Sequence, residues 1–176
     1  MKHSSLSLLL ASMVTLFGAT SPASAAGGVG TKMIAYAKAH LGSRVPATSA
    51  GECTDLVVAS LAASNGQPGN FSNSPFYTWG RLVKPVSKES STGKKLAPKL
   101  YPEAGYIIQF ENCHFATANS SNDFPKHTAI IEHVSGSVLT LLHQNVNGNR
   151  TVVRSTLDMS TLKSGTFQYF SPLPKA

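Results

Sequence analysis

The sequence predicts an α+β domain in which N-terminal helices pack on an antiparallel β-sheet. Apolar residues recur at helical spacing between residues 32 and 66, in the first part of the chain. From Gly105 onward the pattern changes to short β-branched and aromatic runs separated by turn residues. Helices followed by a series of strands are typical of α+β folds, and a chain of 176 residues has room for one domain.

The first 25 residues have the pattern of a secretory signal peptide. Lys2 belongs to a short basic start, residues 6–19 form an apolar core, and small residues make an Ala-x-Ala cleavage site. An uncleaved anchor is the alternative, but the apolar core is short for a spanning helix. We therefore expect a signal peptide at 1–25, a mature domain at 26–176 without stable membrane insertion, and a secreted or periplasmic location.

The chain is basic, with a formal net charge of +7 that falls to about +6 when Lys2 is removed with the leader. Such a charge favours an anionic partner. The basic residues are scattered and no nucleic-acid recognition motif accompanies them. We therefore expect an acidic cell-wall polymer, and no nucleic acid, as the partner.

Two helices are expected before the sheet. The first is "KMIAYAKAHLG" at 32–42, which Gly42 ends, and the second is "GECTDLVVASLAASNG" at 51–66. Asn65-Gly66 suits the C-cap of the second helix. These helix bounds place Cys53 in or just before the first helical turn.

Residues 67–101 are rich in Gly, Pro, Ser, Asn and Lys and predict an ordered excursion with little regular structure. The run at 88–99, "KESSTGKKLAPK", is interpreted as a solvated loop. Trp79 lies in "FYTWGRLV" at 76–83. It either lines a binding groove or anchors the long loop to the core.

Five short runs after Gly105 predict strands, and tight hairpin turns are expected at "SGS" (135–137) and "NGN" (147–149). The strand runs are 105–111, 127–134, 138–145, 151–157 and 166–170.

Residue types suited to thiol chemistry occur in these elements. A helix N-terminus and a nearby imidazole both favour a thiolate, and Cys53 is expected to have the first. His127 opens a predicted strand, and His143 lies near the end of the next one, so a hairpin brings them together. A nucleophile, a base and a group that orients the base are the parts of an activated cysteine site.

The motifs "GECTDLV", "EAGYIIQFEN" and "HTAIIEHVSGSVLTLLHQNVNG" resemble the cysteine, histidine-dependent amidohydrolase/peptidase (CHAP) family and the related NlpC-type cysteine peptidases. The resemblance spans about residues 31–170 and implies a papain-like core. It implies that Cys53, followed by a small polar residue, is the nucleophile and that His127 is the base. The third catalytic residue would be His143 or Asn145, from the His-Gln-Asn run on the following strand.

The sequence departs from the family pattern at two positions. His143 stands where the CHAP group commonly has an acidic residue, although NlpC-type enzymes often use His, and Tyr106 replaces a frequent Asp. Trp79-Gly80 is similar to an aromatic element of these families. Trp79 and Thr54 are the expected substrate-binding residues.

Cys53 and Cys113 are the only cysteines, and in an exported chain a single disulfide between them is the simple alternative. Cys113 and His114 are expected in a loop after the first strand. A zinc centre made with Cys53 and His127 fits no standard ligand spacing, so we expect no metal and no cofactor.

The leading hypothesis is a secreted cysteine hydrolase that cleaves amide bonds in bacterial peptidoglycan or another peptide substrate. Its oxyanion would be held by the Cys53 backbone N–H and a nearby polar side chain. The alternative is a secreted, non-catalytic binding or structural protein on the same fold, with Cys53 and Cys113 bridged.

Overall fold

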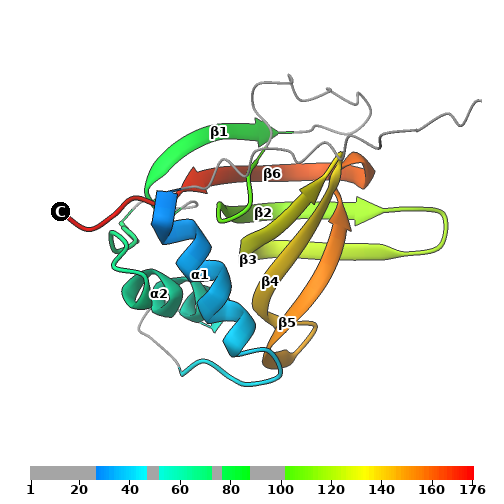
Figure 1. The fold of residues 1–176 in the computed structure, drawn as a ribbon. Helices are drawn as coiled ribbons and strands as arrows, with labels where there is room; N and C mark the ends of the chain where they lie inside the picture. Colours follow the sequence, from blue (N-terminus) through cyan, green and yellow to red (C-terminus); the bar gives the residue numbers. More distant parts are fainter. Residues whose placement is uncertain (1–26, 47–51, 73–76, 88–101) are drawn as a thin grey trace, which may run out of the picture.

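The computed structural model describes residues 27–46, 52–72, 77–87 and 102–176. The described chain begins with two helices, which a six-stranded sheet follows (Figure 1). The helices are α1 (Gly27–Ala39) and α2 (Glu52–Ala63). The strands are β1 (Arg81–Ser87), β2 (Ile107–Ala116), β3 (Ser121–Ser135), β4 (Val138–Val146), β5 (Asn149–Asp158) and β6 (Leu162–Ser171), with a 3₁₀ turn at Met159–Thr161 before β6.

The sheet is antiparallel throughout and has the strand order β1-β6-β2-β3-β4-β5. Hairpins join β2 to β3, β3 to β4 and β4 to β5, and β6 crosses over to lie between β1 and β2. Both helices lie at one end of the sheet beside β3 and β4 (Figure 1), and α2 packs directly on these two strands. The predicted α+β arrangement, with helices on an antiparallel sheet, is therefore present.

The helix side of the sheet holds one of two hydrophobic cores. In α1, Val29, Met33 and Ala37 are buried at intervals of four residues, which is the spacing of one helix face. Alternate residues of the strands, such as Ile130 and Leu142, meet them. The buried residues of this core are Val29, Met33, Ala37, Val45, Leu56, Val57, Leu61, Trp79, Ile107, Ile130, Leu142, Val152 and Phe170.

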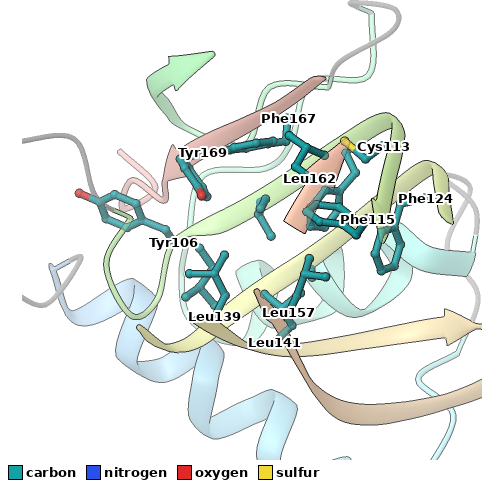
Figure 2. Close-up of a cluster of buried hydrophobic side chains, with 14 residues drawn as sticks. Tyr106, Cys113, Phe115, Phe124, Leu139, Leu141, Leu157, Leu162, Phe167 and Tyr169 are labelled. Atoms are coloured by element: carbon teal, nitrogen blue, oxygen red, sulfur yellow. The ribbon is translucent and has the colours of Figure 1, made fainter. Parts of the chain in front are cut away.

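The other face of the sheet carries the second core, which is rich in aromatic rings. Figure 2 shows side chains from five strands meeting there, among them Phe115 from β2, Phe124 from β3 and Tyr169 from β6. These residues alternate along each strand with those of the helix side, as the pleat requires. Since both faces are covered, the central strands are apolar along most of their length.

The expected hairpin turns are present. Asn147 and Gly148 both have positive φ angles, of 51° and 78°, as a two-residue turn of the mirror-image type requires. Gly136 has a φ of 58° in the turn before β4. These turns fix the pairing of β3, β4 and β5.

The structure differs from the prediction made from the sequence at two places. Part of the segment expected to lack regular structure forms β1, which pairs with β6. Cys113, expected in a loop, lies within β2, because β2 and β3 continue as a paired hairpin as far as Ala116 and Ser121. The predicted leader at 1–25 and the predicted loop at 88–99 lie outside the described residues.

None of the helices in the described ranges is long and apolar enough to cross a membrane.

Candidate active site

Cys53 is the second residue of α2, as the sequence predicts, and its side chain is half-buried. The backbone N–H of Thr128 in β3 donates a hydrogen bond to the Cys53 thiol. The start of α2 therefore meets β3 at the residue that directly follows His127. Cys53 and His127, which are 74 positions apart in sequence, lie in neighbouring elements at one end of the sheet.

Burial raises the pKa of the Cys53 thiol above its ordinary value of 9.0. The Thr128 N–H lowers this pKa, the negative charge of Asp55 raises it, and the positive charge of Lys126 lowers it. Burial is the largest of these effects, because it penalises the charged thiolate. Cys53 is therefore a neutral thiol at neutral pH.

His127 is buried among aromatic rings. Its imidazole stacks on Phe124, with ring centroids 5.3 Å apart, and lies 6.5 Å from Phe110. Its Nε2 is 3.0 Å from Nδ1 of His143 in β4. The hydrogen bond of His127 thus goes to His143, and Nδ1 is the ring nitrogen that remains for other chemistry.

The two histidines meet where the strands separate. β3 and β4 pair from Ile130 and Leu142 toward the turn, so the His127 end of β3 has no backbone partner in β4. The hydrogen bond between the two imidazoles connects β3 and β4 where the backbone hydrogen bonds are missing. The same separation leaves the Thr128 N–H available to Cys53.

Ser155 of β5 continues the chain of hydrogen bonds. Its Oγ lies 2.8 Å from Nε2 of His143. His143 stands opposite Val153 in the β4–β5 ladder, so Ser155 is the diagonal neighbour on the same face. Ser155 was not predicted from the sequence as a site residue, although the period of two in β5 places it on one face with Val153.

Both imidazoles are neutral over most of the pH range. Burial, with a smaller contribution from His143, lowers the pKa of His127 to about 3. Burial alone lowers the pKa of His143 to about 4. A solvated imidazole would charge near pH 6.5, so it is burial that keeps His143 neutral in mild acid.

The structure separates the roles of the three residues in the His-Gln-Asn run. His143 bonds His127, whereas Gln144 is fully buried and its amide both accepts from the Val45 N–H and donates to the Val45 carbonyl. Asn145 has a φ of 62° at an irregularity in the β4–β5 ladder. This left-handed residue interrupts the regular alternation of side chains along β4, by which Asn145 would share a face with His143.

The two expected substrate-binding residues are buried. Trp79 is 0% exposed and its Nε1 donates to Gln109 Oε1 at 2.9 Å. This placement favours the alternative in which Trp79 anchors its segment to the core. Thr54 is 2% exposed, so its side chain is not presented to solvent.

The exposed Lys126 contacts the half-buried ring of Tyr77. Nζ of Lys126 sits 4.3 Å from the centroid of the Tyr77 ring, a cation–π contact. Tyr77 in turn packs edge-on against Phe71, which is 40% exposed. The positive charge of Lys126 lowers the pKa of the Cys53 thiol, so this lysine favours negative charge there.

Cys53 and Cys113 are both free thiols. Cys113 lies in the aromatic core, where its Sγ donates to the Thr166 carbonyl at 3.2 Å, and burial raises its pKa to about 11. The disulfide of the non-catalytic alternative is therefore not formed. His114 pairs with Asp123 at 2.6 Å. Within the described ranges no group of three or more His, Cys, Asp or Glu side chains is placed to hold a metal ion.

A cysteine at the start of a helix, packed against a strand that carries a buried pair of hydrogen-bonded imidazoles, fits a cysteine proteinase fold. The chain belongs to the family described as the AIM3/BBC1 Cysteine proteinase-fold domain, whose profile matches residues 22–176. The match covers all the described elements. It supports the papain-like core that the sequence resemblance implied, in this family and not specifically in the CHAP or NlpC groups.

Comparisons with individual proteins add little to the family assignment. No curated protein matches the chain. Two solved structures are similar, the crystal structure of Ly7917 and that of Ly7917 with the hydrolyzing product of MDP, with TM-scores of 0.46 and 0.48. In each case the identity is 19%, and the match covers 80% of this chain and 62% of the other. The chain thus spans less than two thirds of the length of these structures.

Proposed function

We propose that this chain is a secreted cysteine hydrolase that cleaves amide bonds in peptidoglycan stem peptides. The observation that carries the proposal is the buried hydrogen bond, 3.0 Å long, between His127 Nε2 and His143 Nδ1. It fixes an imidazole next to the residue that contacts the Cys53 thiol. Orientation of the base by a third group is the defining feature of a cysteine or serine triad.

The proposed reaction needs only groups of this chain and water. Cys53 Sγ attacks the amide carbonyl carbon, and the thiol proton passes to His127 Nδ1, since His143 occupies Nε2. The tetrahedral intermediate breaks its carbon–nitrogen bond as His127 returns the proton to the leaving amine. Water, activated by His127, then hydrolyses the thioester and regenerates the Cys53 thiol.

Lys126 and Tyr77 support an anionic substrate. An ammonium group that lies over an aromatic ring and lowers the pKa of the proposed nucleophile suits a peptide that carries a carboxylate near the scissile amide. Peptidoglycan stem peptides carry such carboxylates, and the basic net charge of the chain favours an acidic wall. Secretion itself rests on the leader pattern at residues 1–25.

The test is incubation of the mature protein with purified peptidoglycan, followed by mass spectrometry of the soluble fragments. Wild-type protein should release fragments with a new free carboxylate and a new amine, whereas Cys53→Ala and His127→Gln should release none. Cys113→Ser is the matched control, because it changes a cysteine outside the site. Fragments of the same kind from Cys53→Ala would overturn the proposal.

Lys126→Gln tests the substrate class. We expect it to raise KM for a substrate with a carboxylate beside the amide by about three- to tenfold, the size of one exposed charge interaction, and to leave a neutral substrate unaffected. An equal effect on both substrates would contradict a carboxylate subsite.

The non-catalytic alternative also has an observation in its favour. The Cys53 pKa is raised and that of His127 is lowered to about 3, so the resting site holds no thiolate. Intact peptidoglycan that nevertheless pulls the wild-type protein down in a sedimentation assay would favour a wall-binding protein on this fold.

A further inference from the structure

We propose that Ser155 is a positioning residue that sets which nitrogen of His127 carries the proton. Ser155 acts through His143, by accepting a hydrogen bond from the His143 Nε2–H. The catalytic meaning of this role rests on the proposed function. The protonation pattern itself does not, and it can be measured in protein that has no activity.

Two hydrogen bonds restrict where the protons of the two buried imidazoles can lie. Two neutral imidazoles carry one N–H each, and the two contacts are 3.0 Å between His127 Nε2 and His143 Nδ1 and 2.8 Å between His143 Nε2 and Ser155 Oγ. Both hydrogen bonds must therefore be donated in the same direction, either from His127 toward Ser155 or from Ser155 toward His127. Only two patterns satisfy both contacts.

In the first pattern His127 Nε2–H donates to His143 Nδ1, and His143 Nε2–H donates to Ser155 Oγ. His127 Nδ1 then has a free lone pair and can take a proton from a thiol. In the second pattern Ser155 O–H donates to His143, His143 Nδ1–H donates to His127, and His127 Nδ1 carries the hydrogen. The second pattern blocks the base, so the direction of the Ser155 hydroxyl decides between an active and an inactive site.

Two observations favour the first pattern. Ser155 lies on β5, at the edge of the sheet, and is half-buried, so its own proton can go to solvent while its oxygen accepts. His143 is only 1% exposed, so its Nε2–H depends on Ser155 for a partner.

Three variants of β5 separate this role from a structural one. Ser155→Ala removes the acceptor, and Ser155→Thr keeps a hydroxyl on a side chain that suits a strand. Thr156→Ala is the matched control, because Thr156 is the next residue of β5 and is exposed. We expect Ser155→Ala to lower kcat about three- to tenfold, the effect of one hydrogen bond, and Ser155→Thr to restore most of the loss.

The deciding measurement is the ¹⁵N chemical shift of both ring nitrogens of His127 and His143 at pH 7. In the wild type and in Ser155→Thr, we expect the proton of each ring on Nε2 and an unprotonated Nδ1. In Ser155→Ala, we expect a detectable population with the proton of His127 on Nδ1. A wild-type His127 protonated on Nδ1 would overturn the proposal, and so would the same ¹⁵N pattern in Ser155→Ala and Ser155→Thr.

The two proposals fail in distinguishable ways. If peptidoglycan stays intact while the wild-type ¹⁵N shifts show the proton on Nε2 of both rings, the hydrolase is excluded and the positioning role of Ser155 stands. If Ser155→Ala does not fold, the wild-type shifts and the Ser155→Thr variant still test the pattern.

Discussion

The buried histidine pair predicts a specific loss of stability in mild acid. His127 and His143 have pKa values of about 3 and about 4 in the folded protein and about 6.5 when unfolded. Between pH 6.5 and 4, these two imidazoles are therefore protonated in the unfolded state and neutral in the folded state. The stability that these residues contribute is fully present above pH 6.5 and is lost as the pH falls toward their folded values.

The magnitude follows from the difference in bound protons. When the pH falls from 7.5 to 5, protonation of each imidazole in the unfolded state lowers the free energy of unfolding by about 1.5 pKa units, or about 2 kcal/mol. The pair therefore lowers it by about 4 kcal/mol. This is a large part of the 5–15 kcal/mol by which domains are ordinarily stable. Glu132 and Asp158, whose pKa values are lowered, also weaken the fold in acid, but they remain in any histidine variant.

Urea unfolding at pH 7.5, 6 and 5 tests this prediction. The double variant His127→Gln/His143→Gln cannot titrate at these positions, and its amide groups can still bond to each other. The wild type should lose about 4 kcal/mol more than the double variant over this range. His133→Gln, at an exposed position of β3, controls for the substitution itself. Equal losses in the wild type and the double variant would refute the buried neutral pair.

Three further outcomes are expected. Cys53 should react slowly with iodoacetamide at pH 7 and about tenfold faster per pH unit up to pH 9, because burial raises its pKa. The alkylation rate is measured by mass spectrometry, and a rate that stops rising below pH 8 would contradict this prediction. Cys113→Ser should keep kcat and lower the free energy of unfolding in urea by about 1 kcal/mol, since a hydroxyl can still donate to Thr166. Trp79→Phe should lower that free energy by about 2–3 kcal/mol through the lost bond to Gln109 and the void, with KM unchanged; a selective rise in KM would restore the groove interpretation.

The strand pattern was predictable because it is local. The period of two and the Asn-Gly turn at 147–148 place β4 and β5 within one or two residues of their observed bounds. β1 was missed because its pairing partner, β6, lies about 80 positions away and no local signal marks an edge strand that contains Pro85. Cys113 was misplaced for a similar reason, since only the ladder between β2 and β3 shows how far the hairpin extends.

The site was predictable as a set of residue types and not as a set of environments. Cys53 and His127 were identified from a helix start and a strand start, and the structure brings these two elements together. Ser155 needed the register of β4 against β5, which the sequence does not specify to one residue. The pKa of His143 needed its burial, which depends on side chains from several strands that lie far apart in the sequence.

The environments constrain how the proposed hydrolase would work. Burial raises the pKa of Cys53 and lowers that of His127 to about 3, and both shifts oppose transfer of the proton from the thiol to the imidazole at rest. A preformed thiolate–imidazolium pair is therefore not the resting state. The proton has to move as the sulfur–carbon bond forms, when the negative charge passes from sulfur to the carbonyl oxygen. A base held in the correct tautomer matters most in such a step, because His127 has to accept the proton at the moment of attack and cannot hold it beforehand. The hydrogen-bonded chain from His127 through His143 to Ser155 can meet that requirement without raising the pKa of either ring.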